Sequence, residues 1–458
     1  MNDVVIHART RLHPGSQADD AVARSAMTKA MWRILPLILL AYVMAYMDRV
    51  NVSFASLQMN DDLKFSATIY GLGGGLFFLG YALFEVPSSL MLARFSAPQW
   101  IARIMITWGL LAAGMMFVRT PMQFYVMRFL LGVAEAGFFP SVIYYFSHWF
   151  PMTWRGRAVS RIYVASSLAA IVMGGISGAL LGLDGTAGLE GWQWLFLVEG
   201  LPAVLLGLIL LRFLPAAPAS VRWLTEPEKA WIDGELGRDA ALIGAPVRHN
   251  LLAAFANPKV LLLGAIGCLG NGAGNGLLLS APAVLIAGTG LDVRRVGYLV
   301  SIGGAIGIVC ILFAGWHSDR GGDRLRNALA YVAATVAALL LIGVSSTPAL
   351  VIVGYLLFAA SFFTGGMLVL SSWADVLHVR ELAVGSAAIN TLWQIGSFLS
   401  PYAWGVAKDA TGSYRAALIG GAVLAVFEGI LILYIRSRVI AERRGRALAL
   451  EQLVAVPA

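Results

Sequence analysis

Four charged residues stand inside otherwise apolar stretches: Asp48 and Arg49 in "AYMDRVNVSF", and Arg128 and Glu135 in "RFLLGVAEAGFF". On a helix, Arg128 and Glu135 would be two turns apart and share one face. A charge inside a bilayer costs about 2.5–3.5 kcal/mol on insertion scales, so such residues persist where they face protein or water. A carboxylate held between arginines in that setting can exchange a proton when the helices rearrange. We therefore predict that Asp48 and Glu135 bind the protons of a proton-coupled carrier.

Arginine suits the other half of this chemistry, because its planar guanidinium forms two parallel hydrogen bonds with a carboxylate and stays charged. We predict that Arg49 and Arg128 contact the carboxylate of a substrate. An organic anion bound there would compete with Asp48 or Glu135 for the same cations, so anion binding and proton binding would favour each other. The alternative is an ion-pair network that only holds two helices together.

Further polar residues in apolar stretches are secondary candidates for substrate binding. They are Tyr81, one turn before Glu85, and the group Asn390, Trp393 and Gln394. Their side chains could hydrogen-bond a substrate from both halves of the chain. Contacts between neighbouring helices are the alternative for each of them.

The elements that must position these residues are membrane-spanning helices. The chain has 458 residues, of which 59% are hydrophobic and 13% charged, a balance foreign to water-soluble globules. About 20 apolar helical residues cross a bilayer. The sequence predicts an all-α polytopic membrane protein with twelve such spans in two six-helix halves, at residues 34–58, 66–93, 100–118, 122–147, 158–183, 192–214, 257–288, 293–316, 327–346, 348–377, 382–407 and 413–436.

The distribution of Lys and Arg predicts the orientation in the membrane. With the N-terminus inside, 25 of these residues fall on the cytoplasmic side, six fall in outer loops, and Arg49 and Arg128 lie within spans. Basic residues near short loops favour the cytoplasm. We therefore expect both termini in the cytoplasm of a cell whose inner membrane holds the protein. The net charge of +8 then reflects topology and anionic lipid rather than nucleic-acid binding.

The predicted spans divide the chain into five parts. We expect a polar tail at 1–29, a six-helix bundle at 30–214, a cytoplasmic linker at 215–256, a second bundle at 257–437 and a tail at 438–458. Within the linker, "TEPEKAWIDGEL" is typical of a short interfacial helix, with Thr225 as N-cap and Glu228 closing a capping box.

The two predicted bundles resemble each other at a shift of about 225 residues, which pairs Gly71 with Gly297 and Arg155 with Arg380. Many transporters are internal duplications of this kind, with the substrate site near the midplane between the halves. Enzyme chemistry is not expected. Cys268 and Cys310 lack metal-ligand spacing, and the sequence holds no Ser-His-Asp set or phosphate loop. We expect no cofactor other than the coupling proton, and a monomer whose partners are a small organic anion and lipid.

Several motifs together resemble the major facilitator superfamily and, within it, the anion:cation symporter family of tartrate, hexonate, phthalate and hydroxyphenylacetate carriers. The motifs are "YMDRVNVSFA", "FEVPSSLMLARF", "RIMITWG", "RFLLGVAEAGFFPSVIYYFSHWFP" followed by "RGRA", and "GWHSDRGGDR" at 315–324. The resemblance implies the twelve-helix fold of that superfamily. It further implies that Asp48 and Glu135 are protonation sites, with Arg49 as the substrate contact and Arg128 as the partner of Asp48. Asp319, Arg320 and Arg324 would belong to a gating motif.

The sequence also departs from the family pattern. The loop "ARFSAPQW" lacks the usual aspartate, Asn275 and Ser280 replace aromatic residues, and Trp393 and Gln394 stand where a Gly-Asn pair is expected. The departure in the loop bears on gating, whereas those at Asn275, Ser280 and Trp393 favour an aromatic or bulky acid over a sugar-derived acid. We expect proton-coupled uptake of an organic carboxylate anion by alternating access. The alternatives are a proton-coupled exporter of small organic acids and an organic-acid receptor that does not transport.

Overall fold

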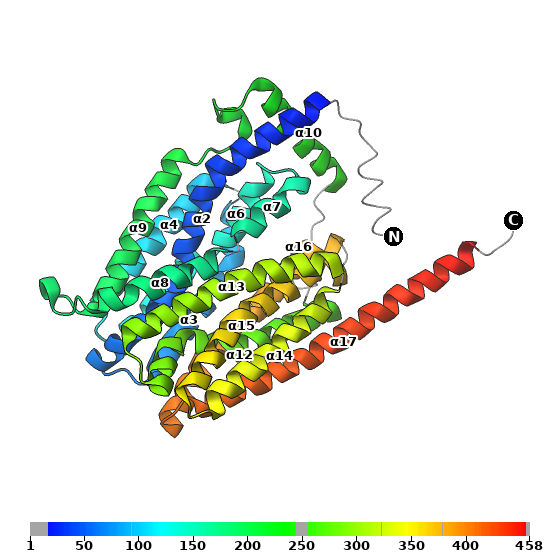
Figure 1. Ribbon diagram of the computed structural model, residues 1–458. Coiled ribbons are helices and arrows are strands. Elements are labelled where there is room, and N and C mark those ends of the chain that lie inside the picture. The colour runs from blue at the N-terminus through cyan, green and yellow to red at the C-terminus, as the bar shows by residue number, and fades with distance from the viewer. Residues whose placement is uncertain are drawn as a thin grey trace.

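The computed structural model describes residues 17–92, 94–162, 164–243, 255–321, 323–377 and 379–454, and the regular structure in these ranges is helical. Figure 1 shows long helices packed side by side in two groups. The first group holds the helices that come before residue 214. They are α2 (Gln17–Asp62), α3 (Ala67–Leu92), α4 (Ala97–Gly114), α5 (Pro121–Glu135), α6 (Phe138–Ser147), α7 (Met152–Ile162), α8 (Ala165–Leu181) and α9 (Gly191–Phe213).

The second group holds six uninterrupted helices, α12 (Pro258–Thr289), α13 (Val293–Gly321), α14 (Arg324–Val344), α15 (Pro348–Val376), α16 (Val379–Thr411) and α17 (Arg415–Val454). In the described part of the chain, 11 helical stretches are long and apolar enough to cross a membrane, counting α5 with α6 and α7 with α8 as one stretch each. With α16, which carries several amide and hydroxyl side chains, they make the twelve spans predicted from the sequence. The predicted fold class is confirmed.

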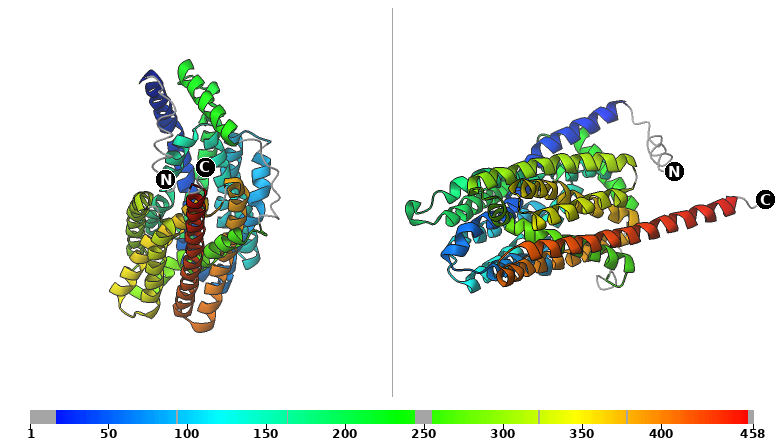
Figure 2. Two further views of the ribbon diagram at one scale, coloured as in Figure 1. Left: turned by 90° about the vertical axis from the view of Figure 1, so that its right-hand side faces the viewer. Right: turned by 60° about the horizontal axis from the view of Figure 1, so that its bottom comes forward.

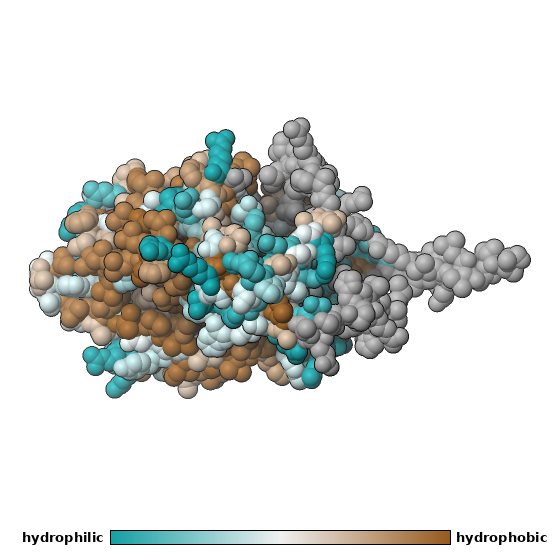
Figure 3. Space-filling model, turned by 90° about the horizontal axis from the view of Figure 1, so that it is seen from above, coloured by the Kyte–Doolittle hydropathy of each residue, from teal (hydrophilic) through white to brown (hydrophobic). Residues whose placement is uncertain are grey.

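The surface of the bundle is apolar over much of its area, as Figure 3 shows from one side. Large apolar side chains such as Phe117, Leu205, Val309 and Leu312 are more than half exposed. A water-soluble protein rarely leaves so many contiguous apolar groups exposed. The protein therefore crosses the membrane several times.

The fourth span is broken beside one of the predicted site residues. Helix α5 ends at Glu135 and α6 begins at Phe138. Between them, Gly137 has φ +84°, and a Cβ there would lie 2.2 Å from Oγ of Ser88. Only glycine adopts this left-handed conformation at so close an approach without strain. The break places Glu135 at a helix end that is buried in the bundle.

The two halves meet most closely at one end of the bundle. We call the end where α2 begins and α17 finishes the near end, and the opposite end the far end. Toward the far end, a Cβ at Gly174 of α8 would lie 2.3 Å from the carbonyl oxygen of Gly297 of α13, and one at Gly71 of α3 would lie 2.2 Å from that of Pro401 of α16. Toward the near end the two groups of helices diverge (Figure 1). The far end is therefore closed in this structure.

A carboxylate joins the halves at the far end. Oδ1 and Oδ2 of Asp409 in α16 accept hydrogen bonds from the backbone N–H groups of Ala67 and Thr68, at 3.1 and 2.8 Å. These N–H groups begin α3 and have no partner inside their own helix. Asp409 thus caps a helix of the other half.

The predicted linker helix is present as α10 (Glu226–Ile243), while residues 244–254 of the linker lie outside the described residues. Glu228 accepts hydrogen bonds from Thr225 N–H at 2.8 Å, Ser25 Oγ at 2.6 Å and Lys29 Nζ at 2.7 Å. Burial alone would raise the pKa of Glu228, but the hydrogen bonds from Lys29, Ser25 and Thr225 outweigh it and lower the pKa to about 2.

The first and last described helices, α2 and α17, are longer than the spans predicted for them. Residues 17–29, predicted as tail, form the first turns of α2, and α17 continues to Val454. Figure 2 shows α17 extending past the rest of the bundle. Ala26 and Met27 are fully buried, so tertiary contacts stabilise helix where the sequence pattern is polar.

Candidate substrate and proton site

Helix α2 presents the two charges of "AYMDRVNVSF" to different partners in the first half. Nη2 of Arg49 donates to Oε1 of Glu135 at 2.5 Å. Oδ2 of Asp48 lies 3.9 Å from Nη1 of Arg128. Adjacent residues on a helix are about 100° apart, which allows each to pair with a different residue. The structure therefore brings together the four residues that the sequence singled out.

The Asp48–Arg128 pair is buried and loosely held. Both residues are 1% exposed, and the Arg128 guanidinium lies 4.9 Å from the ring centroid of Phe77. Among the described residues, neither oxygen of Asp48 has a hydrogen-bond partner. A 3.9 Å separation keeps Coulombic attraction but is too long for a hydrogen bond. The Asp48 oxygens are thus available to a proton.

The structure adds a third carboxylate that the sequence reasoning did not select. Glu199 of α9 is 2% exposed, and one of its oxygens accepts a hydrogen bond from the amide of Asn51 in α2. Its other oxygen has no partner among the described residues. Glu199 stands in the apolar stretch "WLFLVEGLPAVLL", so the rule that identified Asp48 would have found it too.

We call these five residues, Asp48, Arg49, Arg128, Glu135 and Glu199, the charge cluster. It contains three carboxylates and two guanidinium groups, so with every group ionised it carries one net negative charge. Its carboxylates are 1–2% exposed. Burying uncompensated charge is unfavourable, and one bound proton would neutralise the cluster.

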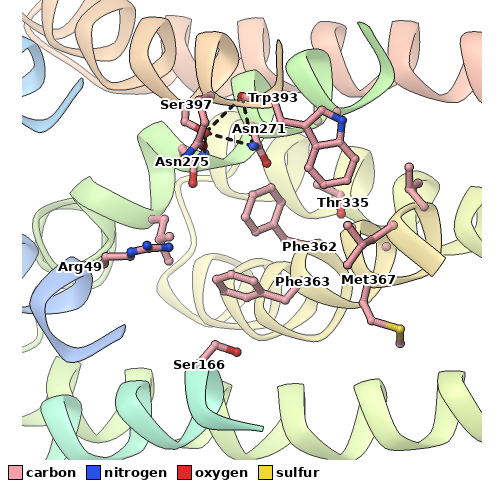
Figure 4. Close-up of a pocket in the computed structure, with 18 of the residues that line it drawn as sticks. Arg49, Ser166, Asn271, Asn275, Thr335, Phe362, Phe363, Met367, Trp393 and Ser397 are labelled. Carbon is pink, nitrogen blue, oxygen red and sulfur yellow. Dashed lines mark hydrogen bonds between the residues drawn. The ribbon is translucent and has the colours of Figure 1, made fainter. Parts of the chain in front are cut away.

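Arg49 connects the charge cluster to a cavity of about 260 Å³ between the halves. Its guanidinium lies 5.3 Å from the ring centroid of Tyr46 and 5.6 Å from those of Phe77 and Tyr81. Figure 4 shows the side chain of Arg49 directed into the cavity. An anion in the cavity could therefore reach Arg49 while Glu135, which does not line the cavity, stays paired with Arg49.

Polar and aromatic side chains of the second half form most of the cavity wall. Asn271 and Asn275 of α12 both donate to Oγ of Ser397 in α16, each at 3.0 Å. Phe362 and Phe363 of α15 extend into the same space (Figure 4). The cavity thus offers one arginine, several amides and flat apolar faces, a combination suited to a carboxylate on an aromatic or bulky body.

The predicted substrate contacts divide into two sets. Arg49, Trp393 and Gln394 line the cavity, whereas Arg128, Tyr81 and Asn390 do not. Arg128 is buried in the charge cluster, Tyr81 packs against Arg49, and Nδ2 of Asn390 donates to Glu85 across the halves at 2.7 Å. Their role in substrate binding stays a prediction.

The indole of Trp393 lines the cavity with its ring, while its N–H group donates to the protein backbone and not into the cavity. Its Nε1–H donates to the carbonyl oxygen of Leu263 at 3.0 Å. Trp393 therefore supports the expectation of a bulky substrate through its ring. Of the two residues that stand where the family pattern has aromatic residues, Asn275 lines the cavity and Ser280 does not.

The predicted gating motif lies at the near end of the second half. Nη1 of Arg324 lies 3.2 Å from Oδ2 of Asp375, and Arg436 binds Asp323 at 2.8 Å. The guanidinium of Arg320 lies 4.0 Å from the ring centroid of Trp316. Asp319 lies within α13, but its side chain is outside the described ones. The ion pairs join the start of α14 to the end of α15 and to the middle of α17, while gating itself stays a prediction.

Comparison with known proteins identifies similar transporters. The sequence matches the family description Major Facilitator Superfamily over residues 38–401. A proposed tartrate transporter of Agrobacterium vitis is 38% identical over 420 residues, which are 92% of this chain and 93% of that protein. A quinolone resistance transporter of Acinetobacter baumannii is 36% identical over 405 residues, or 88% and 93% of the two chains.

The fold has counterparts among solved structures. The xylose transporter XylE from E. coli, in a partially occluded inward-open conformation, matches with a TM-score of 0.68 at 14% identity. The match covers 89% of this chain and 98% of that one. At this identity the match bears on the fold alone.

Proposed function

The chain belongs to the major facilitator superfamily of membrane transporters, and we propose that it takes up an organic carboxylate together with protons by alternating access. It is a transporter rather than an enzyme. In this proposal it works as a monomer in the inner membrane, with both termini in the cytoplasm, as the bias of Lys and Arg toward that side favours. The proposed tartrate transporter of Agrobacterium vitis supports a carboxylate substrate.

The observation that carries the proposal is the composition of the charge cluster beside the cavity. Three buried carboxylates face two arginines, and one of those arginines lines the cavity. A cluster with one excess negative charge favours the binding of one proton. The membrane potential opposes the entry of an anion into a negative cell interior unless the protons carried with it at least match its charge.

Competition for Arg49 supplies the coupling. When a substrate carboxylate binds Arg49, Glu135 loses its ion-pair partner, and its affinity for a proton rises. Conversely, a proton on Glu135 frees Arg49 for the substrate. Each ligand thus raises the affinity for the other by the same factor, as linkage requires.

The closed far end supports alternating access. With the near end in the cytoplasm, this structure corresponds to an inward-facing state. The glycine contacts between α8 and α13 and between α3 and α16 would then separate when the site opens outward.

The test is transport by purified protein in liposomes under an imposed pH gradient. Asp48→Asn, Glu135→Gln and Glu199→Gln each leave two carboxylates against two arginines. We expect each to abolish accumulation driven by the pH gradient while counterflow exchange partly survives. Normal pH-driven accumulation in the Asp48 and Glu135 variants would show that the proton assignment is wrong.

Export is the second candidate, because a relative 36% identical over most of its length bears the name quinolone resistance transporter. The same charge cluster would serve an exporter that exchanges substrate for protons. Measuring uptake and efflux in whole cells separates the two directions. A receptor that binds without transport would bind carboxylates but show no counterflow.

A further inference from the structure

The second half contributes a buried carboxylate to the cavity that the charge cluster does not include. Glu428 of α17 is 8% exposed and lines the cavity. No described residue makes a hydrogen bond or ion pair with it. A carboxylate at this depth without a cation is unfavourable, and its position in the cavity wall leaves it accessible to a ligand.

The local packing makes room for this carboxylate. A Cβ built at Gly270 of α12 would lie 2.6 Å from Oε1 of Glu428, so any other residue at 270 would occupy space next to the carboxylate. Asn271 follows Gly270 and also lines the cavity. The side chain of Glu428 therefore reaches the cavity across the backbone of α12.

Arg49 and Glu428 line the cavity from different halves. Arg49 is thirteen residues from the far end of α2, and Glu428 is thirteen residues from the far end of α17, at Asp62 and Arg415. At 1.5 Å per residue, each lies about 20 Å along its own helix from that helix's far end. The cavity thus has a cation in one half and a carboxylate in the other, and the aromatic side chains Phe362 and Phe363 line the same space (Figure 4).

We propose that Glu428 binds a cationic amine of the substrate, so that the preferred substrates are aromatic acids that carry both a carboxylate and an ammonium group. The carboxylate binds Arg49, the ring packs against Phe362 and Phe363, and the ammonium pairs with Glu428. This inference rests on the proposed function for its carboxylate contact. It narrows the substrate class from organic anions to zwitterions.

Two probe pairs test the proposal in the full-length protein. Each pair matches an amine to an apolar compound of the same shape: 4-(aminomethyl)benzoate with 4-ethylbenzoate, and 4-(2-aminoethyl)benzoate with 4-propylbenzoate. We expect at least one amine to bind the wild type tenfold or more tightly than its partner, as measured by thermal shift and by counterflow. Glu428→Gln should abolish that preference and change the affinity for the apolar acid by less than about twofold.

Two further variants distinguish an effect at Glu428 from a general loss of folding. Gly270→Ala should displace the carboxylate and weaken the preference for the amine. Glu442→Gln, on the same helix but at the exposed near end beside Lys259, should preserve it. Melting temperatures without ligand check that all variants fold.

The outcomes separate the two proposals. If the apolar acids bind but neither amine is preferred, or if Glu428→Gln keeps the preference, the inference is wrong and the proposed function stands. If none of the four acids binds, the inference of an aromatic substrate is wrong, and the proposed function is then decided by its own test with other carboxylates.

Discussion

At the scale of single residues, the charge cluster divides the work between its two arginines. Arg128 is buried beside Asp48, whereas the Arg49 side chain is 27% exposed and reaches the cavity. Both guanidinium groups lie near the ring of Phe77, at 4.9 and 5.6 Å. Arg49, which lines the cavity, suits substrate binding, and Arg128, which does not line it in this structure, suits charge compensation.

Arg49→Lys should weaken substrate binding while keeping the positive charge. An ammonium cannot form the two parallel hydrogen bonds that a guanidinium gives a carboxylate. Loss of one charge-assisted hydrogen bond, about 1.5–3 kcal/mol, corresponds to a roughly ten- to hundredfold weaker Kd. Titration of the purified variant with a transported acid measures it.

Arg128→Lys is the matched control for that experiment. Because Arg128 does not line the cavity, its conservative replacement should change Kd by less than about threefold. An equal loss of affinity in both variants would contradict the division of roles between Arg49 and Arg128.

At the scale of elements, local breaks and caps position the site. Helix α5 ends at Glu135, and the left-handed Gly137 two residues later begins α6, which lets a helix terminus lie inside the bundle. Pro258 and Pro348 occupy first turns of α12 and α15, where a missing N–H is tolerated. These short-range signals fix where each helix begins and hence at which depth its polar residues lie.

The contact between α2 and the linker helix α10 should resist mild acid. The lowered pKa of Glu228, about 2, means that its ionised form is favoured in the folded state. Its stabilising effect is therefore complete above the ordinary pKa of 4.5 and is lost as the pH falls from there toward 2. Hydrogen exchange of the α10 amides should show constant protection from pH 8 to 5.

Glu228→Gln should raise the exchange rates of α10 about tenfold or more at neutral pH, because it loses hydrogen bonds to a charged group. Glu226→Gln is the control, since the side chain of Glu226 is 86% exposed and, among the described residues, its ion pair is with Lys229 of its own helix. Similar rates in both variants would contradict the role of Glu228.

At the scale of the whole molecule, close contacts between the halves favour closure of the far end. Gly174 and Gly297 allow the backbones of α8 and α13 to touch. Asp409 of α16 accepts hydrogen bonds from the first backbone N–H groups of α3. Because each half is a packed bundle, opening the far end requires the halves to move against each other as bodies.

Gly174→Ala should shift the protein toward states with an open far end. The added methyl group would lie 2.3 Å from the Gly297 carbonyl oxygen, whereas one at Gly175 would meet nothing within 4 Å. Spin labels at the exposed far-end residues Thr186 and Ser346 should report longer distances in Gly174→Ala. The Gly175→Ala control should match the wild type, and equal distance distributions in both variants would contradict the prediction.

The sequence predicted the twelve spans and the residues at the centre of the charge cluster, because a charge in an apolar helix is costly wherever the helix packs. It also predicted α10 and the approach of Arg49, Trp393 and Gln394 to a shared space. It did not reveal which polar residues make hydrogen bonds between helices, as Asn390 does with Glu85. That depends on the neighbour each side chain meets.

What the sequence by itself determined was therefore the membrane-spanning fold and the presence of buried charge, since hydropathy and helical periodicity are properties of each segment alone. Only the tertiary structure decided that Asp48 pairs with Arg128 and Arg49 with Glu135, that Glu199 makes the carboxylates outnumber the arginines, and that Glu428 faces the same cavity. These facts depend on how helices from distant parts of the chain are rotated and placed against one another, which no single segment encodes.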